Sequence, residues 1–217
     1  MTKVPKIRMP KAPVKLPTYV TPEHFAEIYK ACESARRPAN MPADWWRALM
    51  IFGYMTGWRI GEVLALRRKD LDLENAMAIT RAVDNKPGRD DQVPLHPIVV
   101  EHLRRIQGFG DLVFDWTHDR RTLDDEYHDI QRSAGINLTC SGSSSHRCTL
   151  ACHVYGFHDL RRSFATRNAL RMSADDLQAM MRHKSYLTTK RYIAMAGRLD
   201  KVVSSLDVPR LPGFKAS

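Results

Sequence analysis

Hydrophobic residues recur with the helical period of about 3.6 positions over most of the chain. Two predicted helices carry a clear start signal. Thr21 stands before Pro22, and Ser173 stands three residues before Asp176, as N-cap residues do. The pattern predicts helices at about 22–33, 44–56, 60–66, 97–107, 122–134, 158–171, 174–182, 187–195 and 198–205.

Strand-like segments are short and few. Residues 77–81 and 92–95 have strand character, and residues 84–89 between them have the Asn, Pro and Gly content of a turn. These segments predict one hairpin. The sequence therefore predicts a mainly α fold with a small antiparallel β-sheet, an α+β class.

Length and composition fit one sizeable domain, because 43% of the 217 residues are apolar. No apolar run is long enough to span a membrane, and no apolar stretch follows the basic N-terminus as it would in a secretory signal. Four cysteines in a chain of this length do not form a disulfide framework. We therefore expect a protein of the reducing cytoplasm.

Positive charge is concentrated in two parts of the chain. The formal net charge is +10; residues 1–20 contribute +5, and residues 158–192 contribute another +5. Residues 1–20 also contain four prolines, which is typical of an extended basic arm or linker. Clustered cations indicate a polyanionic partner, most simply nucleic acid, although the same charge could serve solubility alone.

A histidine and two arginines stand where they could hold an anion. His158 and Arg161 share one face at the start of a predicted helix, where guanidinium suits phosphate oxygens and imidazole can transfer a proton. Taken alone, such a pair is more often a solvated surface. Arg59 stands at a break between two apolar helices, where it needs a ligand or an ion pair with an acid such as Glu62.

Two further residues could take part in a reaction, depending on their surroundings. Lys86 lies in the predicted turn, where a lysine is usually only exposed. Tyr192 follows Lys190 and Arg191 on a predicted helix. A tyrosine there normally packs against its neighbours, but nearby cations would favour its phenolate form as a nucleophile.

Residues 135–156 form an insertion rich in Gly, Ser, Cys and His, in which apolar periodicity is lost. Cys140, His146, Cys148 and Cys152 could supply the thiolate and imidazole ligands of a tetrahedral zinc site, with His153 as an alternative ligand. The spacing does not match the paired pattern of zinc fingers. A polar loop with chance cysteines is the competing interpretation.

Four segments, in the same order and spacing, resemble the tyrosine recombinase (phage integrase) family over about residues 18–205. Residues 56–72 are similar to its first arginine box, and residues 158–166 are similar to its His-x-x-Arg box. Residues 182–192 are similar to its terminal box, in which a histidine stands nine residues before the nucleophilic tyrosine. Lys86 has the position of the lysine in the family's β-hairpin.

The resemblance implies the catalytic-domain fold of DNA breaking-rejoining enzymes and a reaction at a DNA phosphodiester. Tyr192 would attack the phosphorus, form a 3′-phosphotyrosyl link and release a 5′-hydroxyl; the reverse step would join a new strand. Arg59 and Arg161 would hold the non-bridging oxygens and stabilise the additional negative charge of the transition state.

The remaining family positions map onto proton transfer and phosphate binding. Lys86 would protonate the leaving 5′-oxygen, His158 would assist proton transfer from Tyr192, and His183 would hydrogen-bond the phosphate. Protein cations take the place of catalytic metals, so we expect no cofactor for catalysis. Zinc in the insertion would be structural.

The chain also departs from the family pattern. Arg182 stands where the family commonly has glycine, and Pro87 stiffens the turn that carries Lys86. The family's N-terminal core-binding domain is absent, which indicates a fragment or a naturally short member. The expected parts are a basic arm at 1–20, a catalytic domain at 21–207 and a flexible tail at 208–217.

The expected partner is double-stranded DNA. Four copies of the protein are expected on synapsed duplexes, and the protein without DNA could be a monomer. Residues 198–217 favour this assembly, because the corresponding family segment docks onto a neighbouring copy. A topoisomerase-like nicking and closing enzyme shares the same chemistry. A non-catalytic DNA-binding accessory protein should lack one of the six catalytic positions given above, and none of them is lost. A zinc-based interaction module is a further alternative. We expect the protein to act at the nucleoid of a prokaryote, in the context of a mobile element.

Overall fold

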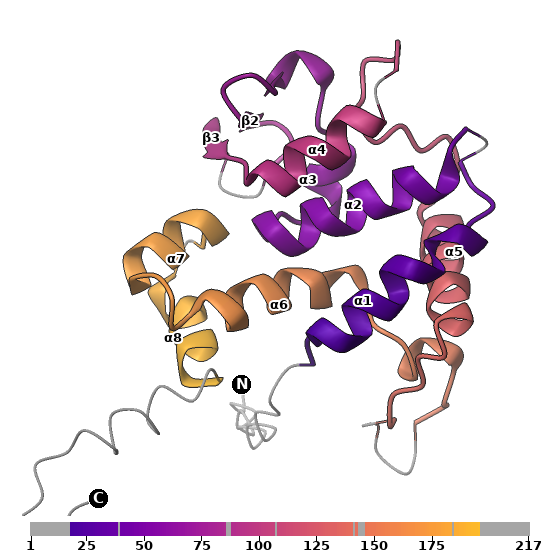
Figure 1. Cartoon of the computed structure of the whole chain (residues 1–217). Coiled ribbons are helices and arrows are strands. Elements are labelled where there is room, and N and C mark those ends of the chain that lie inside the picture. Colours follow the sequence, from indigo (N-terminus) through magenta and orange to yellow (C-terminus); the bar gives the residue numbers. More distant parts are fainter. Residues whose placement is uncertain are drawn as a thin grey trace, which may run out of the picture.

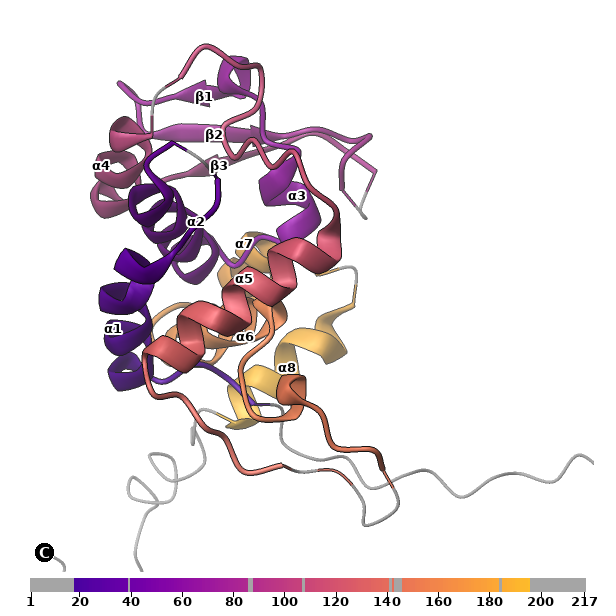
Figure 2. The same cartoon turned by 90° about the vertical axis from the view of Figure 1, so that its right-hand side faces the viewer.

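The structure, a computed structural model, describes residues 18–38, 40–85, 88–106, 108–140, 142, 146–183 and 185–195. Helices surround a central helix, and a small sheet lies at one end (Figures 1 and 2). The helices are α1 (Pro22–Ala31), α2 (Pro42–Thr56), α3 (Ile60–Leu64), α4 (Pro97–Arg105), α5 (Arg120–Ser133), α6 (Phe157–Asn168), α7 (Ala174–Met181) and α8 (Tyr186–Met195). Short 3₁₀ turns lie at Cys32–Ser34, Arg68–Asp70 and Leu150–Cys152.

The sheet is antiparallel, in the order β1-β2-β3. Its strands are β1 (Leu71–Asp72), β2 (Met77–Thr80) and β3 (Asp91–Pro94). Ala78 of β2 pairs with Val93 of β3, and both side chains are buried, so this register turns one face of the hairpin toward the core. The mainly α fold with a small antiparallel sheet agrees with the prediction.

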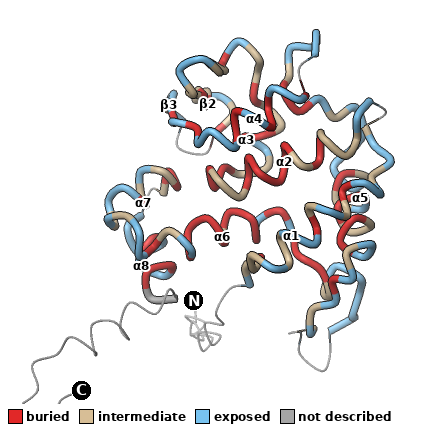
Figure 3. The backbone as a smooth tube through the Cα atoms, in the orientation of Figure 1, coloured by how far each residue is buried: buried red, intermediate tan, exposed pale blue. Residues whose placement is uncertain are grey.

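Helix α2 forms the centre of the helical part and packs against α4 and α6. It is buried along most of its length (Figure 3), as expected of a helix with apolar residues on all sides. Trp46 of α2 stacks on Tyr127 of α5 and on Phe157, the first residue of α6, at ring-centroid distances of 5.9 and 6.1 Å. This stack fixes the start of α6, on which His158 and Arg161 lie.

Both predicted N-caps are confirmed. Thr21 accepts a hydrogen bond from the backbone N–H of His24, and Ser173 accepts one from that of Asp176. Helix boundaries differ from the predictions by a few residues. Helix α5 begins at Arg120 rather than 122, α6 ends at Asn168 rather than 171, and α3 ends at Leu64 rather than 66. Strand β1 went unpredicted because two residues are too short to show alternation.

Several expectations concern residues outside the described part of the chain. They are the basic arm as far as residue 17, the turn residues Lys86 and Pro87, the helix at 198–205 and the tail at 208–217. Among the described residues, no helix is both long and apolar enough to cross a membrane.

Candidate active site

Arg161 lies where the ends of two other helices meet α6. The side chain is buried, and its guanidinium donates hydrogen bonds to the carbonyl oxygens of Gly57 and Met181, at the C-terminal ends of α2 and α7. Helix C-termini carry partial negative charge, so these carbonyls stabilise the buried cation. Burial and the neighbouring Arg59 charge lower the pKa of Arg161 to about 9, which leaves it protonated at neutral pH.

Gly57 makes this arrangement possible. It ends α2 in the left-handed region, with φ of 66°. A Cβ at this position would lie 2.7 Å from Cδ1 of Phe164 on α6. Only glycine therefore allows α6 to approach closely enough for Arg161 to reach the end of α2.

Arg59 precedes α3 and forms the ion pair that its sequence context indicated. Its Nη1 lies 2.9 Å from Oε1 of Glu62, and its backbone N–H donates to Oε2 of the same carboxylate at 3.1 Å. Glu62 is almost fully buried, whereas the Arg59 side chain is 29% exposed. Glu62 therefore holds Arg59 from the protein side and leaves part of its guanidinium accessible.

Arg182 reaches the same carboxylate from the end of α7, where it adopts the left-handed conformation with φ of 50°. Its guanidinium lies 4.6 Å from the ring centroid of Trp58, a cation–π contact. Among the described residues, its buried Nε and Nη1 have no hydrogen-bond partner. Burial lowers the pKa of Arg182, although Glu62 opposes this effect.

These contacts define the arginine group, which consists of Arg59, Arg161 and Arg182 with Glu62. In the described part of the chain, Glu62 is the one carboxylate that forms ion pairs within the group, and Asp91 of β3 attracts Arg182 from farther away. The group therefore carries an excess of positive charge in a largely buried setting. Such an excess is favourable only when an anion binds to it.

His183 and Tyr192 lie together beside this group. Their rings stack at a centroid distance of 5.9 Å and an interplanar angle of 11°. His183 Nδ1 is 3.0 Å from the Thr189 hydroxyl oxygen of α8. Burial and the charges of Arg161 and Arg59 lower the pKa of His183 to about 4, so its ring is neutral at pH 7.

Tyr192 itself is 7% exposed and belongs to a small apolar cluster with Phe164 and Met181. Its hydroxyl group is near enough to Arg161 to affect the pKa of that guanidinium. His158 is exposed on α6, but one part of its ring is covered by protein. This partial loss of hydration lowers the pKa of His158, and the charges of Arg162 and Arg161 lower it further.

The structure thus brings five of the six predicted catalytic residues into one region. Electrostatic interactions link His183 to Arg161, Arg59 and His158, and Arg161 to Tyr192. The sixth residue, Lys86, lies outside the described residues.

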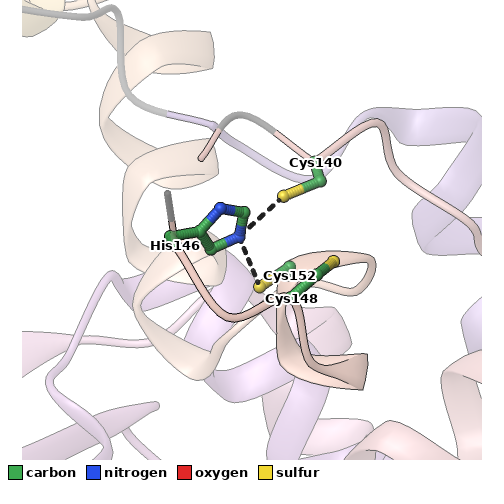
Figure 4. A group of neighbouring side chains, drawn as sticks. All are labelled: Cys140, His146, Cys148 and Cys152. Atoms are coloured by element: carbon green, nitrogen blue, oxygen red, sulfur yellow. Dashed lines mark hydrogen bonds between the residues drawn. The ribbon is translucent and has the colours of Figure 1, made fainter. Parts of the chain in front are cut away.

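The cysteine cluster, which consists of Cys140, His146, Cys148 and Cys152, lies in the insertion before α6 (Figure 4). One ligand atom from each residue lies within 4.8 Å of all the others. His146 Nε2 is 3.1 Å from the Cys140 sulfur and 3.6 Å from the Cys152 sulfur. These four residues could hold a metal ion.

His153, the alternative ligand, lies outside this set. Its Nε2 is 3.1 Å from the Cys148 sulfur, and its Nδ1 is 2.8 Å from the carbonyl oxygen of Leu138. The backbone N–H of Thr149, together with His146, lowers the pKa of the Cys152 thiol to about 6. One cysteine of the cluster is therefore poised to be a thiolate at neutral pH.

The match to a known family covers nearly all of the described chain. Residues 18–198 match the model of the phage integrase family. The chain belongs to this family. The predicted resemblance is therefore confirmed, and so is the catalytic-domain fold, through the solved structures that it matches.

Relatives of this integrase-family chain include tyrosine recombinases. It is 26% identical over 201 residues to tyrosine recombinase XerA of Thermococcus onnurineus, covering 86% of this chain and 61% of the relative. A crystal structure of XerA recombinase superposes with a TM-score of 0.64 at 21% identity, covering 92% of this chain and 68% of that one. XerH recombinase in a post-cleavage complex with its difH substrate gives a TM-score of 0.63 at 25% identity, with 88% and 54% covered. The chain thus spans about three fifths of the length of the XerA recombinase of Thermococcus onnurineus.

Arg182 and Glu62 are the site residues that sequence reasoning did not pair. In the sequence, Arg182 stands out only as a departure from the family's usual glycine, and Glu62 only as a partner for Arg59. They lie 120 positions apart in the chain, so their contact depends on how α3 packs beside the end of α7. Trp58, the ring beneath Arg182, gave no functional signal in the sequence.

Proposed function

We propose that this integrase-family chain catalyses site-specific DNA recombination through a covalent tyrosyl-DNA intermediate. The observation that carries the proposal is the arginine group beside Tyr192: a partly buried excess of positive charge next to a phenol. A phosphodiester supplies the negative charge that such a group lacks, and its oxygens match the planar guanidinium fork.

In the proposed step, the Tyr192 oxygen attacks the phosphorus of a DNA strand. The new bond joins that oxygen to phosphorus, and the bond from phosphorus to the 5′-oxygen breaks. The products are a 3′-phosphotyrosine and a free 5′-hydroxyl, and the reverse reaction with another 5′-hydroxyl joins a new strand. Arg59 and Arg161 bind the non-bridging oxygens, where negative charge builds up in the transition state.

Proton transfer is assigned to three residues. His158, exposed on α6, accepts the Tyr192 proton, in keeping with a lowered pKa that leaves its ring neutral at pH 7. His183 is also neutral and uses one ring nitrogen for Thr189, so its other nitrogen is assigned to a phosphate oxygen. Lys86 is the proposed acid for the leaving 5′-oxygen, on sequence grounds alone.

Glu62 and Arg182 are proposed as positioning residues. Glu62 fixes Arg59 through two hydrogen bonds. Arg182 shares the charge of that carboxylate, so Glu62 does not fully neutralise Arg59. This sharing keeps the Arg59 charge available to the phosphate.

The proposed reaction uses no metal and no other cofactor, because protein cations stabilise the phosphate. The Zn²⁺ that suits the cysteine cluster is proposed as a structural ion, since its ligands lie in the insertion and not among the reacting groups.

Double-stranded DNA is the proposed substrate, and four copies on two synapsed duplexes are the proposed assembly. A lambda integrase tetramer bound to a Holliday junction has the same fold, with a TM-score of 0.64 at 22% identity. Mass measurement of the protein with and without a recombination site tests the assembly. A complex with one copy on one duplex throughout the reaction would contradict it.

The chemistry is tested with nicked suicide duplexes, from which the cleaved fragment diffuses away and traps the intermediate. The duplexes carry the DNA that flanks the protein's own coding sequence, together with a pool of random sequence. Wild-type protein should form an adduct that survives denaturation, and Tyr192→Phe should form none. Tyr186→Phe is the matched control, because Tyr186 is exposed on the same helix.

An adduct from Tyr192→Phe would overturn the assignment of the nucleophile. Relaxation of supercoiled plasmids of any sequence at the rate of site cleavage would instead indicate a nicking and closing enzyme.

A further inference from the structure

The described residues in the middle of the insertion between α5 and α6 form no apolar core. Ile136 and Val154 are buried at its two ends, but residues 146–151 between them are all exposed. Leu150, the large apolar side chain of this exposed segment, is 41% exposed. A loop of this length loses much conformational entropy when it becomes ordered, and apolar burial within the loop does not offset that loss.

The two ends of the insertion are nevertheless tied together. The backbone N–H of Leu138 donates to the carbonyl oxygen of His153 at 2.8 Å. Beyond this closure, Gln131 of α5 binds both the N–H and the carbonyl of Tyr155, at 2.7 and 2.9 Å. The fold therefore holds the entry to α6 firmly, whereas the described residues 146–151 are exposed and gain little from apolar burial.

The cysteine cluster is close in size to a tetrahedral zinc shell, and its widest ligand-atom separation, at most 4.8 Å, would contract by about 1 Å on binding the ion. Zinc–sulfur bonds of about 2.3 Å and zinc–nitrogen bonds of about 2.0 Å place neighbouring ligand atoms about 3.5–3.8 Å apart. The His146 nitrogen lies 3.1 and 3.6 Å from two of the sulfurs, and all four ligand atoms lie within 4.8 Å of one another. We propose that Cys140, His146, Cys148 and Cys152 bind one Zn²⁺, which orders the insertion in front of α6.

The donor set selects the ion. Three thiolates and one imidazole suit Zn²⁺, whereas Mg²⁺ and Ca²⁺ require oxygen ligands. Four protein ligands fill a tetrahedron and leave no open position, which is the mark of a structural rather than a catalytic site.

The backbone around the ligands also fits a metal-bound cluster. The N–H of Gly142 lies 3.4 Å from the Cys140 sulfur, and the N–H of Thr149 lies 3.5 Å from the Cys152 sulfur. Hydrogen bonds of this kind stabilise ligating thiolates. A Cβ at Gly142 would collide with the His146 ring, so this position accommodates the imidazole only as glycine.

His153 completes the surroundings without being a ligand. It bridges the Cys148 sulfur and the carbonyl oxygen of Leu138 at the base of the loop. It therefore links the metal shell to the part of the insertion that the fold already holds. This inference deepens the proposal of a structural ion and does not depend on the DNA reaction.

Arg147 provides a direct readout, because it lies between the ligands His146 and Cys148 and is the only Lys or Arg in residues 133–160. A bound ion would fix His146 and Cys148 on either side of Arg147. It would therefore prevent the Arg147–Cys148 peptide bond from entering a protease active site. Trypsin should therefore cut after Arg147 only when the metal is removed by a chelator, and readdition of Zn²⁺ should restore protection.

The decisive experiment measures metal content by mass spectrometry on full-length protein purified under reducing conditions without chelators. We expect one zinc per chain, and on replacement by Co²⁺ the visible spectrum of a tetrahedral thiolate site. Cys148→Ser should lower metal affinity at least about 100-fold, whereas Cys32→Ala, which removes a buried thiol distant in sequence from the cluster, should retain one zinc per chain.

A matched histidine pair tests the ligand assignment. His146→Gln should lose the metal, whereas His153→Gln should retain it with affinity reduced about tenfold, as expected for an outer-shell residue. Gly142→Ala should also weaken binding without removing a ligand. The opposite order for the two histidines would overturn the ligand set. Protein that holds well below one zinc per chain, binds none on reconstitution and is cut equally with and without chelator would overturn the site, whether or not the protein cleaves DNA.

Discussion

Arg161 of the arginine group lies only nine residues after Cys152 of the cysteine cluster, but the fold supports the two sets of side chains in opposite ways. Arg161 is buried and bonded to the ends of two helices, and Glu62 is bonded to two arginines. The cysteine cluster lies in a loop whose residues 146–151 are exposed. The first set of side chains is positioned by the folded core, whereas the hydrogen bonds that the structure describes for the cysteine sulfurs are with one another, with His146 and His153, and with nearby groups of the same loop.

The two sets of residues would therefore bind their proposed partners, a DNA phosphate and a zinc ion, in different ways. The arginine group is preorganised at a cost, because like charges are held together before any anion arrives, and that arrangement suits transition-state stabilisation. With the proposed zinc bound, the cysteine cluster would gain its order from the ion itself, as small metal sites do. Damage to the first should therefore reduce catalysis, and it should also reduce stability where it removes a donor to buried carbonyls, as at Arg161. Damage to the second should remain local.

The largest effect is expected from Arg161→Ala. Two buried carbonyls would lose their donor, so the free energy of unfolding should fall by about 3 kcal/mol. Loss of a transition-state contact should also slow cleavage by about 10²–10³-fold. Urea unfolding and single-turnover cleavage measure the two effects. Arg167→Ala, an exposed arginine on the same helix, is the control and should change neither by much. Equal effects of both variants would show that Arg161 has no special role.

Arg182→Gly should have an intermediate effect. Glycine removes the left-handed strain but leaves Glu62 to neutralise Arg59, so cleavage should slow by about tenfold, or about 1.4 kcal/mol. The added change Glu62→Gln should restore part of the rate, because it returns the excess of positive charge.

Ala76→Gly is the matched control for Arg182→Gly, since Ala76 also has positive φ but lies in the β1–β2 turn. A cleavage rate unchanged in Arg182→Gly, with stability altered as in Ala76→Gly, would make Arg182 purely structural.

Zinc removal should have a smaller effect on catalysis and a strictly local effect on dynamics. Hydrogen exchange in residues 139–152 should become faster after chelation, whereas α6 should keep its protection through the Trp46 stack and Gln131. Cleavage should change less than about threefold. Faster exchange throughout α6 would show that the two regions are not supported independently.

The last prediction concerns the dependence of stability on pH. The pKa of His183 is lowered from 6.5 to about 4 in the folded protein, so the unfolded chain binds the proton more readily. The contribution of neutral His183 is fully present above pH 6.5 and is lost as the pH falls toward 4. Urea unfolding of wild type and His183→Asn should show a steeper loss in the wild type between these values. Parallel curves would contradict the assignment.

Local chemistry made much of the fold predictable. Thr21 and Ser173 cap helices with their own side chains, and the long apolar run of α2 predicts a buried helix. Family spacing, rather than physical reasoning, pointed to Arg59, His158, Arg161, His183 and Tyr192 as one site. Alone, each of these residues had an ordinary structural explanation.

Contacts across the fold were not predictable in the same way. The carbonyls that hold Arg161 belong to Gly57 and Met181, and backbone groups leave no mark in a sequence. The conformation of Arg182 depends on a carboxylate 120 positions away. In the insertion, spacing favours His146 but leaves His153 as an alternative ligand, and the loop geometry separates them.

The most direct test of the central claim identifies the residue that becomes attached to DNA. The trapped adduct is digested with nuclease and trypsin, and its peptides are sequenced by mass spectrometry. Cleavage after Arg191 and Arg198 yields peptide 192–198, in which Tyr192 is the only hydroxyl-bearing side chain. A nucleotide remnant on this peptide is the predicted result. A remnant on the neighbouring peptide that contains Tyr186 would contradict the account.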